Sequence, residues 1–256
     1  MSDWNADQYL KFKKQRTQPS IDLAAMISTV SPKNVIDIGC GPGNSTRVLK
    51  NKFPDAHVTG ADFSPNMIEK AKAENPDVDF MLFDASNDFP KLTEKYDVVF
   101  SNACIQWVPE HEKLLKNMMS VLNDGGVLAV QIPVNTKEPV HRIIREVSSR
   151  EKWADKLGNS RIFYTLSESE YYDVLSEISS SFDMRLITYF HSMPSHMSII
   201  EWYRSTGLKP YLDRLNDAEK NEFEQDILAE LEKEYPKQKN GDIIFRFPRL
   251  FFTAVK

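Results

Sequence analysis

The chain has 256 residues, of which 41% are hydrophobic and 27% are charged, a composition typical of folded globular proteins that excludes disordered and fibrous classes. The net charge of −5 argues against a protein that binds nucleic acid mainly by electrostatics. No apolar run reaches the roughly 18 residues that span a bilayer. The polar start also lacks the pattern of a secretion signal. We therefore expect a cytoplasmic protein with no nucleic-acid or membrane partner.

Cysteine and histidine are sparse. The two cysteines, Cys40 and Cys104, are too few for a disulfide framework, and neither has a neighbour at the spacing of a metal-binding motif. His191 and His196 are five residues apart, which does not place them on one helical face. We therefore expect no metal site, and the sequence shows no sign of an obligatory protein partner.

The first half of the chain alternates between short apolar runs and helical patterns. Residues 1–30 are expected to form an N-terminal helical segment, followed by an α/β core over residues 31–134. Asn44, Ser45 and Thr46 offer N-cap chemistry for one helix, and Ser64-Pro65 is typical of the start of another. A further helix is expected over 110–122. The predicted strands are 34–38, 56–61, 79–83, 97–101 and 127–132.

This alternation indicates parallel strands joined by right-handed helical crossovers. We expect one α/β domain over residues 1–256, with a doubly wound, Rossmann-like sheet. Ligands of such sheets bind at the carboxyl ends of the strands.

The second half changes character. Residues 135–181 and 195–235 read as a helical cap over the binding edge of the sheet, with a capping-box pattern at Ser167 and Glu170. Residues 182–192 and 243–255 are expected to be the final edge strands, forming a hairpin-like pair. With these two, the sheet would have seven strands.

A cluster of glycines follows the first predicted strand. The chain has only nine glycines, yet Gly39, Gly41 and Gly43 lie within five positions. Glycines there let the backbone turn tightly from strand to helix and let a ligand approach closely. The loop is therefore the first candidate for a cofactor site.

The acid before this loop discriminates between cofactors. Asp37 would repel the pyrophosphate of a dinucleotide, and the third glycine comes one residue earlier than in the dinucleotide pattern. S-adenosyl-L-methionine (SAM) has no phosphate and carries an ammonium and a sulfonium. Asp37 suits such a cation, directly or through water. An NAD-dependent oxidoreductase remains an alternative that these features disfavour.

Two further acids end the next strands. Asp62 can accept both ribose hydroxyls, a role that SAM and NAD sites share. Asp84 can accept a hydrogen bond from the adenine amino group, and Phe63 and Met67 could sandwich the adenine ring. Trp107 could face the sulfonium or form a wall of the acceptor pocket.

The glycine loop with Asp62 and Asp84 resembles the class I SAM-dependent methyltransferases. Other motifs resemble the narrower trans-aconitate 2-methyltransferase family, over nearly the whole chain. They include Asn102-Ala103 with Gln106-Trp107, Met193-Pro194-Ser195-His196 and Phe247-Pro248-Arg249. Segments 134–136 and 148–165 depart from the family pattern. The resemblance extends the candidate cofactor residues to Asp37, Gly39, Gly41, Gly43, Asp62, Phe63, Met67, Asp84, Ala85, Asn102, Ala103 and Trp107.

This resemblance implies methyl transfer from SAM to a carboxylate of trans-aconitate or a close small polycarboxylic acid. The products would be a monomethyl ester and S-adenosyl-L-homocysteine. A methyltransferase for another small acid or hydroxyl acceptor is the first alternative. A non-catalytic binding module with this fold is a further one.

A carboxylate acceptor is already ionised at pH 7, so no general base is needed. Catalysis would then rest on proximity and orientation, and we expect no catalytic acid–base residue. His111 is expected at a solvated helix position.

A polyanionic substrate in a closed pocket requires paired charges, which arginine supplies well. Arg249 is the first candidate anchor and Arg16 the second, ahead of Arg204 and Arg246. The other candidate substrate-binding residues are Tyr9, Trp107, Tyr171, Tyr172 and Trp202.

Overall fold

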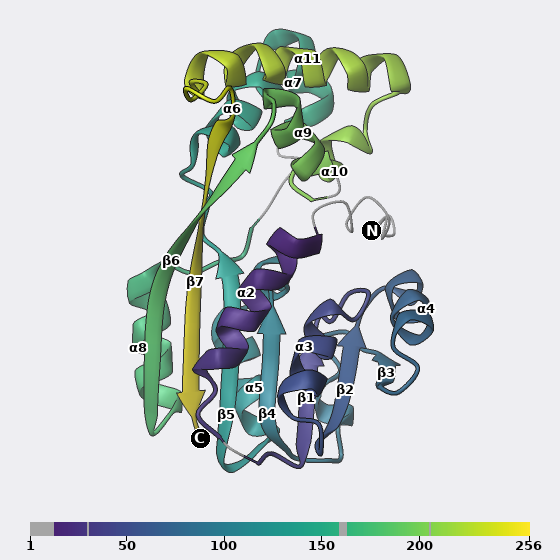
Figure 1. Ribbon diagram of the computed structural model, residues 1–256, viewed down its shortest axis with the longest axis vertical. Helices are drawn as coiled ribbons and strands as arrows, with labels where there is room; N and C mark the ends of the chain where they lie inside the picture. The colour runs from purple at the N-terminus through teal and green to yellow at the C-terminus, as the bar shows by residue number, and fades with distance from the viewer. Residues whose placement is uncertain (1–12, 30, 159–162, 205) are drawn as a thin grey trace. The chain divides into compact units, whose positions relative to one another are not determined.

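The computed structural model describes residues 13–29, 31–158, 163–204 and 206–256, and it divides them into two compact units (Figure 1). The first, here called the sheet unit, comprises residues 13–133, 163–187 and 250–256. The second, the helical unit, comprises the described parts of 134–162 and 188–249.

The sheet has seven strands in the order β3-β2-β1-β4-β5-β7-β6, which confirms the predicted doubly wound fold. Strands β1 to β5 pair in parallel, β1 with both β2 and β4. Their carboxyl ends therefore share one edge of the sheet. These strands are β1 (Asn34–Ile38), β2 (His57–Asp62), β3 (Asp79–Leu82), β4 (Tyr96–Asn102) and β5 (Leu122–Pro133).

Helices of the sheet unit cover both faces of the sheet, and Figure 1 shows α2 in front of it and α5 behind. Helix α4 starts as the sequence predicts: Ser64 caps it by accepting a hydrogen bond from the Met67 N–H, and Pro65 is its first residue. The helical elements are α2 (Lys13–Met26), α3 (Asn44–Lys52), α4 (Pro65–Glu74), η1 (Phe89–Lys91), η2 (Ile105–Trp107), α5 (His111–Ser120) and α8 (Glu168–Ile178).

The last two strands are long, β6 (Ser181–Met193) and β7 (Ile243–Val255), and each continues from one unit into the other. They form the expected neighbouring pair. Of the two, only β6 is an edge strand, because β7 lies between β5 and β6. The Ser180 N–H donates to the Val255 carbonyl, which joins the start of β6 to the end of β7. The pair is therefore antiparallel.

Helix α8 groups with the sheet, which differs from the expected cap boundary at residue 181. Its capping box at Ser167 and Glu170 is confirmed. The reason for the grouping is packing: the Tyr171 side chain is fully buried, and its ring centroid lies 5.5 Å from that of Phe252 on β7.

The helical unit has its own apolar core, which includes Phe223, Phe245 and Trp202. Arg204 forms an ion pair with the buried Glu224 at 2.6 Å. The helices of this unit are α6 (Pro139–Ser148), α7 (Glu151–Leu157), α9 (His196–Arg204), α10 (Lys209–Leu212) and α11 (Asp217–Glu234). Among the helices of the described segments, none has the length and apolar character needed to cross a membrane.

Candidate active site

The glycine loop turns the chain from β1 into α3. The N–H groups of Gly39 and Cys40 both donate to the Ala61 carbonyl at the end of β2, at 2.7 and 3.1 Å. Gly39, Gly41 and Gly43 have φ angles of 78°, 54° and 88°, in the left-handed region that favours glycine. The loop therefore has the unusual backbone conformation that the cluster of glycines predicts.

The loop is crowded on one side and open on the other. A Cβ at Gly39 would lie 2.1 Å from the Sγ of Cys104, and one at Gly43 would lie 2.6 Å from the Nδ2 of Asn75. A Cβ at Gly41 would meet no described atom within 4 Å. Gly41 is thus the point at which a ligand can approach the backbone.

Asp37, one residue before the end of β1 and next to this loop, is fully buried. Its Oδ2 accepts hydrogen bonds from the Ser45 and Thr46 hydroxyls at 2.6 and 2.7 Å. The expected N-cap role of residues 44–46 is therefore wrong: Gly43 is the N-cap residue, without a side-chain cap bond. The hydroxyls serve the carboxylate instead.

The other oxygen of Asp37, Oδ1, is buried and has no hydrogen-bond partner within the described ranges. Burial raises the pKa of this carboxyl to about 6, although the bonds from Ser45 and Thr46 act in the opposite direction. A raised pKa means that the ionised form is under-compensated in this structure. A bound cation would supply the missing compensation.

Asp62 is oriented by the backbone. Its Oδ2 accepts from the Gly41 N–H at 2.8 Å, and its Oδ1 accepts from the Ser64 N–H at 2.9 Å. The next residue, Phe63, is 60% exposed and presents a ring for stacking. Met67, the expected second wall of the adenine site, is 4% exposed and lies in the core of the sheet unit.

Asp84 lies in the turn after β3. Its Oδ1 accepts from the Ser86 N–H and its Oδ2 from the Asn87 Nδ2, at 2.9 and 2.8 Å. Ala85 beside it is buried. Asp84 is therefore fixed by local bonds, and each carboxylate oxygen has a second lone pair for a ligand.

The end of β4 carries unmet acceptors. The side-chain oxygens of Asn102 and Gln106 are buried and have no hydrogen-bond partner among the residues that the structure describes. Ala103 between them has a φ of 54°, uncommon for a residue other than glycine. Gln106, which sequence reasoning placed only in a motif, holds this turn by donating from Nε2 to the Ala103 carbonyl at 2.8 Å.

Trp107 ends the short helix η2, and its ring centroid lies 5.5 Å from that of Phe163. Four of the predicted polar residues lie near the carboxyl ends of the parallel strands. Asp62 and Asn102 are the last residues of β2 and β4, Asp37 is one residue before the end of β1, and Asp84 is two residues after β3. The structure thus brings the predicted cofactor residues to one edge of the sheet.

His111 is buried, so the expectation of a solvated position is wrong. Its Nε2 lies 2.8 Å from the Ile105 carbonyl, and its Nδ1 lies 2.5 Å from the Tyr171 hydroxyl. Because the carbonyl can only accept, Nε2 carries the proton and Nδ1 accepts from Tyr171. Burial lowers the pKa of His111. The pair therefore braces the turn that leads to Trp107.

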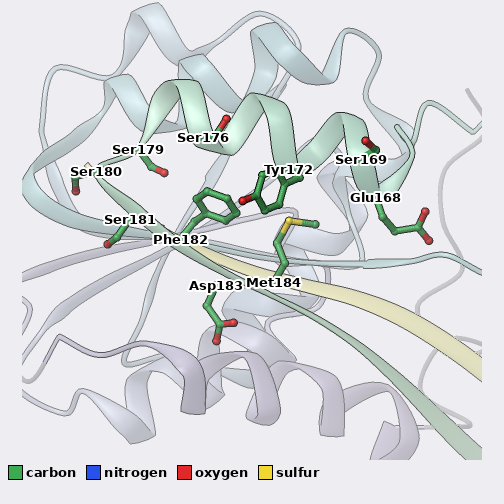
Figure 2. Close-up of a pocket in the computed structure, with 10 residues that line it drawn as sticks. All are labelled: Glu168, Ser169, Tyr172, Ser176, Ser179, Ser180, Ser181, Phe182, Asp183 and Met184. Atoms are coloured by element: carbon green, nitrogen blue, oxygen red, sulfur yellow. The ribbon is translucent and has the colours of Figure 1, made fainter.

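Tyr171 and Tyr172 point to different places. Tyr171 is enclosed by His111 and Phe252, whereas Tyr172 lines a shallow depression between α8 and the start of β6 (Figure 2). There its ring centroid lies 5.0 Å from that of Phe182. The start of β6 is opposite to the carboxyl ends of the parallel strands, so the structure does not bring Tyr172 to the cofactor edge. Its expected role at the substrate is not supported.

The remaining candidates for substrate binding belong to the helical unit or lie outside the residues that the structure describes. Trp202 is buried in the core of the helical unit, and Arg249 in that unit is 4% exposed. Arg204 pairs with Glu224, which accounts for its charge, and Arg246 is exposed on β7. Tyr9 and the side chain of Arg16 lie outside the described part of the chain.

The arrangement fits SAM. Asp37 offers a buried, under-compensated carboxylate to a cation, Asp62 is oriented as a hydroxyl acceptor, and Gly41 leaves open backbone beside Asp62. Asp37 and Asp62 together would repel a pyrophosphate. No group of three metal-ligating side chains occurs among the described residues.

Comparison with known proteins agrees with this chemistry. The methyltransferase domain family matches residues 35–126. Trans-aconitate 2-methyltransferases from Shigella flexneri and Escherichia coli are 42% identical over 254 residues, covering 99% of this chain and 98% of theirs. Among solved structures, the YcgJ protein of Bacillus subtilis superposes with a TM-score of 0.61 at 16% identity, covering 93% of this chain and 97% of YcgJ.

A second solved structure, phosphoethanolamine N-methyltransferase 2 of Haemonchus contortus in complex with SAM, has a TM-score of 0.54 at 19% identity. The match covers 93% of this chain and 52% of that one. At these identities the two structures support the fold alone. The fold and the strand-end acids together define a SAM-dependent methyltransferase. Within that class, the chain belongs to the trans-aconitate 2-methyltransferase family.

Replacing Gly39 by alanine should destabilise the protein by about 2–5 kcal/mol, because left-handed backbone and contact with Cys104 both oppose a Cβ. Gly125→Ala is the matched control: its φ is 75°, but no described atom lies within 4 Å of the added Cβ. It should cost only about 1–2 kcal/mol. Urea unfolding measures both, and equal losses would contradict the crowding argument.

Replacing Tyr171 by phenylalanine should cost about 1–3 kcal/mol of unfolding free energy, because the buried Nδ1 of His111 loses its donor. The neighbouring Tyr172 is 57% exposed, so Tyr172→Phe should change stability by less than about 0.5 kcal/mol. Thermal and urea unfolding compare the two. A loss for Tyr171→Phe no larger than that of its neighbour would show that the pair with His111 is not a brace.

The affinity for SAM should fall at acid pH. The pKa of Asp37 is about 6 without a bound cation, so at pH 7.5 the carboxylate is ionised and at pH 5 about one molecule in eleven keeps it so. Calorimetry should therefore show a Kd about tenfold higher at pH 5 than at pH 7.5. Asp37→Asn should bind weakly at both. A wild-type Kd that does not change with pH would contradict the role of this charge.

The same shift has a consequence for stability. The pKa of Asp37 in the folded protein lies above its ordinary value of 3.8, so this carboxyl contributes to the free energy of unfolding at pH values below 3.8. Its contribution is lost as the pH rises through about 6. The site therefore carries a stability cost at neutral pH that SAM binding offsets.

Proposed function

We propose that this chain transfers a methyl group from SAM to one carboxylate of trans-aconitate, giving a monomethyl ester and S-adenosyl-L-homocysteine. The observation that carries the proposal is the 42% identity to trans-aconitate 2-methyltransferases over 99% of the chain. Identity at that level over the full length includes the helical unit as well as the cofactor loop. A close small polycarboxylic acid is the second candidate acceptor.

When bound, SAM supplies an electrophilic methyl group on a positively charged sulfur. The protein's part is to bind and orient. Asp37 would hold the ammonium, Asp62 the ribose hydroxyls, and Phe63 would stack on the adenine, with Asp84 accepting from its amino group. These roles rest on charge, burial and open backbone at the end of the strands.

The acceptor needs no base from the protein, because a carboxylate is ionised at neutral pH. His111 contacts the turn before Trp107 through the Ile105 carbonyl. Both of its ring nitrogens are already engaged and its pKa is lowered, so it is unsuited to proton transfer in either direction. Orientation and exclusion of water would supply the rate enhancement.

Arg249 is the proposed anchor for a substrate carboxylate. It is 4% exposed, and its guanidinium carbon lies 4.4 Å from the ring centroid of Phe247. A charge in such surroundings interacts strongly with an anion, because little water screens it. The planar fork of arginine can hold both oxygens of a carboxylate.

The two cysteines are free, which agrees with the cytoplasmic location that we propose, since reduced thiols persist there.

A methyl-transfer assay across trans-aconitate, cis-aconitate, citrate, isocitrate and a monocarboxylate tests the proposed function. We expect trans-aconitate to give the highest kcat/KM, with the ester identified by mass spectrometry. Equal turnover of all five acids, or none with trans-aconitate, would reject the specific assignment.

Replacing Arg249 by alanine should raise the KM for trans-aconitate by at least tenfold, an effect of about 1.4 kcal/mol or more, as expected when a charged partner is lost. Arg246→Ala is the control on the same strand, since Arg246 is exposed, and its KM should stay within about twofold. The Kd for SAM should not change in either variant. An unaltered KM for a folded Arg249→Ala protein would remove the anchor.

A further inference from the structure

Aromatic rings surround Arg249 and His191 in the helical unit. The guanidinium carbon of Arg249 lies 4.4 Å from the ring centroid of Phe247 and 5.9 Å from that of Tyr189. The imidazole of His191 lies 4.9 Å from the ring of Trp202 and 6.2 Å from that of Phe247. All five residues belong to this one unit.

The two strands explain why these side chains gather. Tyr189 and His191 are two residues apart on β6, and Phe247 and Arg249 are two residues apart on β7, so each pair points to one face of its strand. The strands are neighbours in the sheet. The contacts of His191 with Phe247 and of Arg249 with Tyr189 show that both pairs share the same face.

His191 brings an unmet hydrogen-bonding atom to this cluster. Its Nε2 is buried and has no hydrogen-bond partner among the described residues. A buried polar atom without a partner costs free energy. Burial, and then the charge of Arg249, lower the pKa of His191 to about 4, so the imidazole is neutral at pH 7. A neutral imidazole can carry its proton on Nε2 and donate it in a hydrogen bond.

We propose that His191 and Arg249 form one carboxylate-binding subsite, in which the guanidinium neutralises a carboxylate of the substrate and the Nε2–H of His191 donates a hydrogen bond to it. This rests on the proposed function, because it assigns a second residue to the substrate named there. A neutral donor suits this position: it adds a directional bond without a second buried positive charge beside Arg249. Arg249 is 4% exposed and the Nε2 atom of His191 is buried, so little water reaches either group.

An anion bound here must change the titration of His191. The side chains that pack on its ring are Tyr189 from β6, Trp202 from α9, and Phe245 and Phe247 from β7, none of which is charged at neutral pH. Arg249 is the charge that lowers the pKa of His191. A carboxylate held by Arg249 offsets that charge and favours the imidazolium.

The first test uses the wild-type protein saturated with S-adenosyl-L-homocysteine, with the histidine rings followed by NMR as the pH is varied. Adding trans-aconitate should raise the pKa of His191 by about one unit or more. The ring resonances of His57, which is exposed and paired with Asp79, should be the same with and without trans-aconitate, so they serve as the internal control. Calorimetry on the same sample measures binding. If trans-aconitate binds and the pKa of His191 stays unchanged, the subsite is overturned.

The second test compares two variants. His191→Phe keeps a ring against Trp202 but removes both nitrogens, and should raise the KM for trans-aconitate by about tenfold with kcat and the Kd for SAM within about twofold. His191→Gln retains a donor near the position of Nε2 and should restore the KM to within about threefold of wild type. His57→Gln is the surface control. An equal increase in the KM for trans-aconitate in His191→Phe and His191→Gln would overturn the proposal. An unaltered KM in a folded His191→Phe protein would also overturn it.

These outcomes separate the two proposals. If trans-aconitate is turned over and its KM does not change in the His191 variants, the proposed function stands and the subsite is overturned. Binding of trans-aconitate that shifts His191 without methyl transfer supports the subsite and overturns the function. If neither trans-aconitate nor citrate binds, the subsite is overturned as well.

Discussion

The buried carboxylate of Asp37 is the constraint on which the cofactor edge depends. It is at the end of a central strand, it is fully buried, and two hydroxyls of the first turn of α3 bind one of its oxygens. This joins β1 to α3 across the glycine loop. The other oxygen, without a partner in the described residues, leaves the site incomplete. The carboxylate of Asp37 therefore shapes the loop through Oδ2 and leaves Oδ1 in need of a cation.

The glycines follow from this constraint. A loop that must bring Ser45 and Thr46 back to Asp37 has to turn tightly, and the left-handed conformations of Gly39, Gly41 and Gly43 make that turn possible. Cys104 fills the space beside Gly39, so the loop is held against the end of β4 as well as against β2. The acids of the neighbouring strands then act on a backbone that is already fixed.

The sequence was sufficient for features that local patterns determine. Strand β1, the cap at Ser64 and the capping box at Ser167 follow from residue type and spacing, and the structure contains all three. The charge of Asp37 was sufficient to choose between cofactor classes. Each of these depends on residues close together in the chain.

Features that depend on distant partners were beyond the sequence. His111 lies at the start of a helix, where its pattern allows a solvated position, but it is buried because Tyr171, sixty residues later, supplies a hydrogen-bond donor. Tyr172, beside it, points to a different side of α8, so the sequence alone could not tell the two neighbours apart as substrate residues. The cluster of His191 with Arg249 likewise needs the pairing of β6 with β7.

A crystal structure with S-adenosyl-L-homocysteine and trans-aconitate would show directly which charged group of the protein contacts which group of each ligand. We predict that the amino group of the amino-acid part of S-adenosyl-L-homocysteine contacts Asp37 Oδ1, directly or through one water, and that a carboxylate of trans-aconitate contacts the Arg249 guanidinium. An amino group turned away from Asp37, or trans-aconitate bound away from Arg249, would contradict this prediction.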